Sequence, residues 1–491
     1  MRLMEPPPGD WIKNLPRILL VLLVMPTTLP GADPASPPGL SARVLALDEC
    51  LRTALDNSHR RPASAFGLEI AEAQHRQALA GYWPQVGLKS GFQRMDQAPD
   101  FLFPASAFSV PAQTINTPIG PLQTSPQTIQ VPAQDVKLMD RDSYFASLNA
   151  TWLLWDGGLR KGLGQQAKGG VDIAKAELRR TELEIHDSVT RMYYGAVLAR
   201  QLHQVGRDTL ARMEATLRLT ETMYKEGSGK VKKTDFLDNK IMVETLRATV
   251  AMLEKNEQLS QAALANTMGL GWQVSVTPSA REIPYQPSSP NLEELVGTAY
   301  GFNLDWKKLD AGLRALDGAE TAARSGHYPK LAMTVDLNKW WNSYDAGLST
   351  SPNKSGWTAG IGVAIPIFNG NLVRNQVREA HARLEKTRED QLLLKEGIGL
   401  MVKDNLLSQI AARKSLEATG EAMKAAEENR DLNTRAYQNE LAETQDVIKA
   451  QLIESLMTAQ HLKSRFDHVA LQSQLTLIIG NEVWKQLKIG P

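Results

Sequence analysis

Few side chains in this sequence have the spacing of a known catalytic or metal-binding motif. The eight histidines are scattered, with no pair four residues apart on a helix and no His-Glu-x-x-His motif of the kind that binds zinc. Neither a Gly-x-Ser-x-Gly nucleophile elbow nor a Gly-x-Gly-x-x-Gly dinucleotide fingerprint occurs. The single cysteine, Cys50, excludes an internal disulfide and a cysteine-based metal site. We therefore expect no enzymatic activity, no metal site and no cofactor.

One glycine-rich stretch, Gly-Ser-Gly-Lys at 227–230, has part of the composition of a phosphate-binding loop. The full motif is Gly-x-x-x-x-Gly-Lys-Ser/Thr, but Tyr224 stands at its first glycine position and Val231 follows the lysine. We therefore exclude nucleotide binding. A formal net charge of only +1 likewise gives no reason to expect a nucleic-acid partner.

Two pairs of charged residues have the spacing of three that puts side chains on one face of a helix. Asp235 and Asp238 are three residues apart, so on a helix they share one face and can point together. Asp446 and Lys449 have the same spacing further along the chain. Ordinary solvated charge is the alternative interpretation of both pairs.

Both pairs lie in a stretch that the chain contains twice, at 152–270 and at 366–481. Each copy passes from an apolar strand through a small turn into a long helical pattern, which breaks after a tyrosine and then resumes. The matching residues are Asp156 and Asn369, and Tyr224 and Tyr437, at an offset of 213, then Asp235 and Asp446, and Gly269 and Gly480, at an offset of 211. An earlier segment repeats at an offset of 245, at 47–84 and 292–329. The chain therefore consists of two similar halves.

The N-terminus has the pattern of a secretory signal. Basic residues precede an apolar run at 18–25, and small residues follow it. The run is too short to span a bilayer as a helix, which takes about 20 residues. We expect a signal peptide at 1–32, cleaved after Ala32, and a flexible lead-in at 33–45. A disordered tail with a chance apolar patch is the alternative.

Alternation of apolar and polar residues with period two predicts four strands, at about 85–95, 143–155, 330–341 and 356–368. Each strand has about the ten residues that cross a bilayer at a tilt. Six of the ten tryptophans lie in or beside these strands, at Trp83, Trp152, Trp155, Trp340, Trp341 and Trp357. Aromatic girdles at the two interfaces of a membrane barrel would have this placement. A soluble β-sandwich with tryptophan in its core is the alternative.

The connection between the first two strands is longer than its counterpart in the second half, because the repeat offset falls from 245 to 213 across it. The extra residues lie at about 98–137 and include seven prolines. Since proline cannot donate a backbone hydrogen bond, no long regular element is expected there. We predict an exposed loop.

Long helices are predicted where proline is absent, between Pro132 and Pro278 and between Pro366 and Pro491. A continuous helix over 157–226 would be on the order of 100 Å long. Such a helix must pack against other helices, as in a coiled coil. We predict two antiparallel helical hairpins, at 157–270 with its tip at about 227–233, and at 371–480 with its tip at about 438–445.

This organisation resembles the outer-membrane efflux protein family, the TolC-like channels. The resemblance covers about residues 46–482, with a first repeat at 46–272, a proline-rich linker at 273–290, a second repeat at 291–482 and a tail at 483–491. Its most specific parts are the two strand-to-helix junctions, Leu-Leu-Trp-Asp-Gly-Gly at 153–158 and Pro-Ile-Phe-Asn-Gly-Asn at 366–371, and the tyrosine before each tip with an aspartate beyond it.

The resemblance implies a mixed fold of α-helices and membrane β-strands. Each chain of a homotrimer would give four strands to a twelve-stranded outer-membrane barrel, and the helices would form a periplasmic coiled-coil tunnel. It also implies a periplasmic adaptor and an inner-membrane pump as partners, in tripartite efflux or type I secretion. Physical chemistry agrees that copies must associate in lipid, because four strands leave two open edges. A periplasmic coiled-coil structural or adaptor protein with a soluble β domain is the alternative.

The resemblance also implies a gate and a docking surface at the tips. In this family acidic residues narrow the periplasmic end, which makes Asp235, Asp238, Asp446 and Lys449 the candidate gate. Lys449 stands where the family has a second aspartate, so a salt bridge from Asp446 to Lys449 of a neighbouring copy is our variant hypothesis. The candidate adaptor-docking residues are Tyr224, Gly227, Ser228, Lys230, Tyr437 and Glu440, the last in place of a family glycine.

Overall fold

The structure is a computed structural model that describes residues 43–137, 139–227, 231–286, 291–342 and 355–480. All of these belong to one unit of the chain, residues 42–491. The predicted signal peptide, most of the lead-in and the predicted tail at 483–491 lie outside the described residues.

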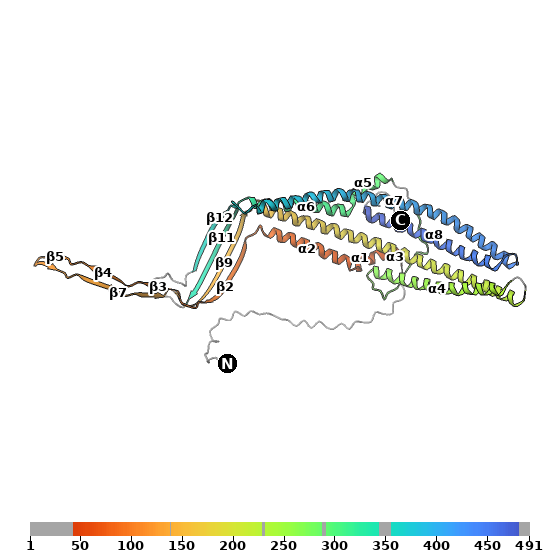
Figure 1. The fold of residues 1–491 in the computed structure, drawn as a ribbon, viewed down its shortest axis with the longest axis horizontal. Helices are drawn as coiled ribbons and strands as arrows, with labels where there is room; N and C mark the ends of the chain where they lie inside the picture. The colour runs from red at the N-terminus through yellow and green to blue at the C-terminus, as the bar shows by residue number, and fades with distance from the viewer. Residues whose placement is uncertain (1–42, 138, 228–230, 287–290, 343–354, 481–491) are drawn as a thin grey trace, which may run out of the picture. The chain divides into compact units, whose positions relative to one another are not determined.

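The helices follow the repeat (Figure 1). They are α1 Leu47–Asn57, α2 Arg60–Ala80, α3 Leu159–Lys225, α4 Lys233–Thr267, α5 Leu292–Phe302, α6 Leu304–Arg324, α7 Leu372–Gln438 and α8 Thr444–Ile479. α3 and α7 have 67 residues each and begin at the repeat offset of 213, while α1 and α5 have 11 residues each and begin at the offset of 245. None of the helices that the structure describes is both long and apolar enough to cross a lipid bilayer.

Two apolar cores occupy equivalent places in the two halves. The first contains Cys50, Ala54, Ile185, Val189, Leu264 and Met268. The second contains Leu295, Ala299, Ile398, Val402, Leu475 and Ile479, at the repeat offsets of 245, 213 and 211 from the residues of the first. In each half, therefore, one short helix packs between the two long helices of the hairpin.

The linker between the halves is packed, unlike the plain linker expected from its prolines. Strand β1 (Arg43–Leu45) pairs in parallel with β10 (Val276–Pro278), so both the end of the predicted lead-in and part of the linker are strands. Val276 and Ile283 are buried in the first core. Arg200 donates hydrogen bonds to the carbonyl oxygens of Pro278 and Ala280. Contacts with α3 therefore hold the linker in place, although its proline-rich sequence predicts no regular structure.

One sheet contains the four predicted strands, β2 Gln85–Arg94, β9 Asp142–Trp155, β11 Lys330–Asn342 and β12 Ser355–Ala364. They pair antiparallel in the order β12-β11-β9-β2, which leaves β12 and β2 at the edges (Figure 1). β12 ends at Ala364, before the predicted end at 368. Two prolines explain the earlier end. Pro366 has no N–H group to donate to the neighbouring strand, and Pro329 comes just before β11, the strand that pairs with β12.

The strand register aligns most apolar residues of the four strands on one face, although Phe145 and Trp340 pair with each other on the other face. Leu148 of β9 pairs with Leu88 of β2 and with Leu337 of β11, and Leu337 pairs with Trp357 of β12. The next such row runs through Val86, Ala150, Val335 and Ala359. The opposite face carries Lys89, Ser147, Asn338 and Gly356. A sheet with one apolar and one polar face is what a membrane barrel with a wet interior requires.

The connection between β2 and β9 is a β-ribbon and not the loop that we predicted. Its residues pair as β3 Asp100–Phe103 with β8 Gln134–Lys137, β4 Ser106–Val110 with β7 Gln127–Val131, and β5 Thr114–Thr117 with β6 Gly120–Gln123. The prolines do prevent a long strand, because Pro104 and Pro111 lie between successive strands. They do not prevent a series of short strand pairs. We call residues 100–137 the distal ribbon.

The first strand-to-helix junction is held by Asp156, which is buried. Its carboxylate accepts hydrogen bonds from the backbone N–H groups of Gly158 and Arg160, and from Nε of Arg160 at 2.7 Å. The same guanidinium donates to the carbonyl oxygen of Leu153 at 2.6 Å. Burial alone would raise the pKa of Asp156, but the hydrogen bonds and the charge of Arg160 hold that pKa below its ordinary value.

Asp156→Asn should therefore destabilise the protein at neutral pH, by about 1.5–3 kcal/mol for the lost charged hydrogen bond. A carboxyl whose pKa is lowered by folding stabilises the fold fully above its unfolded pKa of 3.8, and this stabilisation is lost as pH falls through the lower folded pKa. The difference in thermal midpoint between wild type and variant should thus shrink below about pH 3.8. A constant difference across pH 3 to 7 would contradict this assignment.

Glycines allow α3 and α6 to pack closely. A Cβ atom added at Gly169 would lie 2.6 Å from Cβ of Ala315 and 2.8 Å from the carbonyl oxygen of Ala311. One added at Gly162 would lie 2.5 Å from the carbonyl oxygen of Gly318. Since these neighbours are backbone atoms or a short side chain, they cannot move aside. The spacing of the two helices therefore depends on the absence of side chains at these positions.

Gly169→Ala should push α3 away from α6 and destabilise the protein by about 1–3 kcal/mol. Gly170→Ala is the matched control, because nothing lies within 4 Å of its added Cβ and alanine favours helix by about 1 kcal/mol over glycine. Thermal unfolding of the two variants, followed by circular dichroism in detergent, should move in opposite directions. Equal shifts would mean that the contact between the helices is not close.

Candidate gate and docking site

Each hairpin turns at a residue with left-handed backbone conformation. Gly227 after α3 has φ +70°, and Glu440 after α7 has φ +66°. The two positions are related by the repeat offset of 213, so Glu440 adopts the conformation that Gly227 has at the first tip. For a residue with a Cβ atom this conformation costs about 1–2 kcal/mol. The second tip thus tolerates a strained residue that the first tip avoids.

The two tyrosines at the tips have different environments. Tyr437 on α7 is buried, with only 4% of its surface exposed, whereas Tyr224 on α3 is 40% exposed and stacks on Phe236 of α4. The hydroxyl of Tyr437 lies 2.7 Å from Oγ1 of Thr220 on α3 and 3.1 Å from Oγ1 of Thr444 on α8. Tyr437 therefore joins the two hairpins, whereas Tyr224 stacks on a residue of its own hairpin.

The directions of these hydrogen bonds follow from counting protons. Thr220 donates its single hydroxyl proton to the carbonyl oxygen of Thr216 at 2.8 Å and accepts from the side-chain amide of Asn239. Tyr437 must then donate to Thr220, so it has no proton left for Thr444. Thr444 must donate to Tyr437. The result is a directed chain of hydrogen bonds that joins α8, α7 and α3 and ends on a backbone carbonyl.

Further from the tip, polar contacts continue between the hairpins. Gln451 of α8 donates to Oγ1 of Thr216 at 3.1 Å. One carboxylate, Glu454 of α8, is bonded by two guanidinium groups, Arg212 of α3 at 2.7 Å and Arg430 of α7 at 3.1 Å. Glu454 and Gln451 are both buried. Because burying charges costs desolvation, this ion-pair group is weak evidence for added stability.

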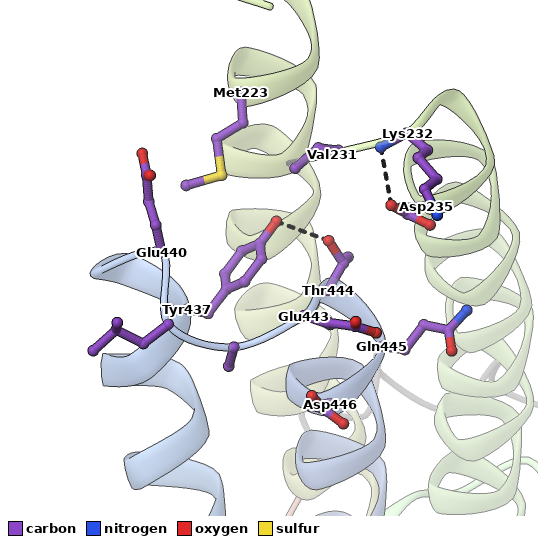
Figure 2. A pocket seen from close by; sticks show the side chains of 12 residues that line it. Met223, Val231, Lys232, Asp235, Tyr437, Glu440, Glu443, Thr444, Gln445 and Asp446 are labelled. Atoms are coloured by element: carbon purple, nitrogen blue, oxygen red, sulfur yellow. Dashed lines mark hydrogen bonds between the residues drawn. The ribbon is translucent and has the colours of Figure 1, made fainter. Parts of the chain in front are cut away.

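A cavity of about 540 Å³ opens between the tips. Figure 2 shows it bordered by Tyr437 and Thr444, which are hydrogen-bonded to each other, and by Lys232, whose backbone N–H is bonded to Asp235. Its remaining lining is Met223, Val231, Glu440, Leu441, Ala442, Glu443, Gln445 and Asp446. Residues of both tips, with carboxylates and a lysine among them, therefore line one cavity.

Of the four predicted gate residues, Asp235 and Asp446 line this cavity together, whereas Asp238 and Lys449 do not. Asp235 accepts a hydrogen bond from the backbone N–H of Lys232 at 2.9 Å and thereby caps α4. Asp238 is exposed on the same helix. Asp446 and Lys449 are exposed on the first turns of α8, where the aspartate also suits the helix dipole. Any ring of these charges must be formed between copies.

The predicted docking residues are likewise divided. Tyr224, Gly227 and Glu440 are exposed at the tips. Tyr437 is buried, so its side chain cannot serve as a docking surface in this chain, and its contacts make it a link between hairpins instead. Ser228 and Lys230 lie outside the described residues. Among the described residues no group of three His, Cys, Asp or Glu side chains is placed to hold a metal ion.

The polar link between the hairpins was missed from the sequence, although a signal for it exists. Thr209, Thr216 and Thr220 lie at spacings of seven and four on α3, where a coiled-coil seam normally has apolar residues. All three are buried. Threonine at seam positions can be recognised in a sequence, but its partners Tyr437, Thr444 and Gln451 lie in the other half of the chain and cannot be assigned without the fold.

Comparison with known proteins identifies the family to which this chain belongs. The family model described as outer membrane efflux protein matches residues 50–270 and 296–481, which is most of the chain. The chain belongs to this family. Members are outer-membrane efflux channels with a periplasmic helical extension, and they are transporters without enzymatic activity. The predicted family, fold class and location are thereby confirmed.

Solved structures share the fold at low sequence identity. A membrane protein from Pseudomonas aeruginosa aligns over 91% of this chain and 98% of its own, with a TM-score of 0.71 and 18% identity. The outer membrane protein VceC from Vibrio cholerae aligns over 88% and 96%, with a TM-score of 0.67 and 18% identity. Nodulation protein T from Rhizobium leguminosarum bv. trifolii is 20% identical over 343 residues, which are 68% of this chain and 71% of that protein.

Tyr437→Phe tests the link between the hairpins. The variant removes the donor to Thr220 and the acceptor for Thr444, which should cost about 1–3 kcal/mol because two buried groups lose a partner. Tyr224→Phe is the control, since it is the repeat-related tyrosine and is 40% exposed. Thermal midpoints measured in detergent should fall for the first variant only. Equal midpoints for both would show that the buried hydroxyl contributes nothing to hairpin association.

Proposed function

We propose that three copies of this chain form a passive exit duct across the outer membrane and periplasm, gated at the hairpin tips. The observation that carries the proposal is the four-stranded sheet, which has one apolar face and two open edges. In lipid every backbone N–H and C=O group needs a partner, so β12 of one copy must pair with β2 of the next. Three copies give the twelve strands that the family resemblance implies.

The helices have matching free surfaces. α7 exposes Leu393, Leu400 and Leu407 at strict spacings of seven. α4 exposes Ile241, Met252 and Leu259 at spacings of eleven and seven, which are close to whole numbers of helical turns. Exposed apolar residues at heptad spacing are the surface of a helix that packs on another helix. In a closed ring, each copy would cover the α7 stripe of its neighbour.

The tips support docking of a periplasmic adaptor that connects the duct to an inner-membrane pump. The two hairpin ends lie at opposite walls of the 540 Å³ cavity, and exposed charges of both signs surround it, including Lys232, Glu443 and Asp446. A partner that separates Tyr437 from Thr220 would part the hairpins. Around three copies, Asp446 and Lys449 would alternate, and a salt bridge between neighbours would close the end.

A membrane test separates this proposal from a periplasmic structural protein. After a carbonate wash the protein should stay in the outer-membrane pellet, and the purified protein should conduct in planar bilayers. Lys449→Ala should raise conductance by removing the salt bridge, whereas Lys424→Ala, whose lysine pairs with Glu421 on its own helix, should not. Recovery as a washed-out monomer would refute the duct, and unchanged conductance in Lys449→Ala would refute only the gate.

Leu400→Lys tests assembly through the helices. A lysine in the centre of the α7 stripe would lose about 1.5–3 kcal/mol of apolar burial in each copy and would add the desolvation of a charge. We expect the trimer to dissociate at lower detergent and temperature in light-scattering measurements. Leu400→Met keeps an apolar side chain of similar size and should leave the trimer unchanged. Equal stability of the two variants would place the interface elsewhere.

A further inference from the structure

The distal ribbon carries exposed apolar side chains that nothing in the described chain covers. Its three strand pairs are separate two-stranded sheets, each made only of its own two strands among the described residues. Phe101, Phe108 and Ile115 are 52%, 62% and 50% exposed. An isolated two-stranded hairpin is at best marginally stable in water. A ribbon of this length therefore needs a further surface to pack against.

Each section of the ribbon has one apolar face. The strand register places Phe101 opposite Val136, Phe108 opposite Ile129, and Ile115 opposite Leu122. The residues next to them point to the other face and are mostly polar, such as Ser109 opposite Thr128. Apolar pairs directly opposite each other recur in all three sections, so the pattern is a property of the whole ribbon.

The ribbon also lacks the usual protection against association. Between Asp100 and Asp135 the sequence contains no Asp, Glu, Lys, Arg or His. Soluble proteins normally guard open strand edges with charged residues, lysine above all. The absence of charge also disfavours a partner that is recognised by its charge, such as an anionic lipid headgroup. A neutral surface meets no electrostatic penalty when it packs against a second copy of itself.

The position in the chain identifies the partner. The ribbon joins β2 to β9 at the ends of these strands that lie away from α2 and α3, and β2 is an edge strand of the sheet. Under the proposed function, on which this step rests, that edge pairs with the next copy. Each ribbon then stands beside the ribbons of the neighbouring copies.

We propose that the apolar face of the distal ribbon packs against the same ribbon of neighbouring copies of this chain, so that the assembled channel has an uncharged β-collar outside the membrane. The corresponding connection in the second half is shorter, since the repeat offset falls from 245 before the ribbon to 213 after it. Each chain therefore contributes one distal ribbon to the collar, and the barrel strands themselves pair without it. The collar would lengthen the exit and add an intersubunit contact beyond the membrane.

Crosslinking through introduced cysteines tests the collar in the full-length protein. The native Cys50 is fully buried, and burial raises the pKa of its thiol to about 11, so the parent protein is an unreactive background. Ile115→Cys places a thiol on the apolar face, and Asn116→Cys places one on the opposite face of the same strand. With a short bismaleimide, the first variant should give covalent dimers on denaturing gels and the second should give few.

Light scattering on the same samples separates the possible failures. If the protein is trimeric but Ile115→Cys does not crosslink, or crosslinks no more than Asn116→Cys, the collar is refuted and the duct stands. If the protein is monomeric, the proposed function and the collar both fail.

Limited proteolysis gives a second readout. Replacing the pair Phe108 and Ile129 by glutamine should speed cleavage within the ribbon about tenfold, because two covered apolar side chains are lost. Replacing Ser109 and Thr128 by glutamine, on the other face, should leave the rate unchanged. Equal rates for both double variants, with trimers intact, would show that the apolar face is not covered by other copies.

Discussion

Hydrogen bonding of the backbone in lipid is the constraint on which the rest of this structure depends. The four strands satisfy one another inside the sheet, but β12 and β2 each leave a row of donors and acceptors without strand partners in the part of the chain that the structure describes. Water could satisfy these groups, and hydrocarbon cannot. A chain that presents an apolar sheet face to lipid therefore needs other copies to supply hydrogen-bond partners for its edge strands. The heptad stripe on α7 extends the same requirement from the strands to the helices.

The two halves of the chain share one architecture, and they differ at a few places. Each of the six buried residues of the second apolar core has a counterpart in the first, larger core at the repeat offsets. The first half additionally holds the linker, through Arg200 and the β1–β10 pair, and carries the distal ribbon. At the tips, one tyrosine is exposed and the other is buried between hairpins. Departures from symmetry are thus concentrated at the two ends of the duct and at the packed linker.

The tip combines directed polar contacts between the hairpins with a strained turn. Hydroxyl groups and a shared carboxylate join α3 to α7 and α8, beside an apolar cluster that contains Met213, Val243 and Ile448. Buried polar groups are costly to leave without partners, so these hydrogen bonds favour the arrangement of the hairpins in which they are all made. The strained turn at Glu440 lies beside this link. Under the proposed gating, opening at the tip would have to break these contacts.

The sequence by itself determined the four strands of the main sheet, the long helices and the repeat. Period-two alternation located the four strands and the absence of proline located the long helices, because both are local patterns that the backbone must obey. Two internal offsets identified the halves. The tertiary structure alone decided the strand register that joins four apolar faces into one, the packing of the linker, the paired ribbon and the burial of Tyr437. Each of these depends on contacts between residues far apart in the chain, and no local pattern specifies which distant partner a strand edge or a hydroxyl group will meet.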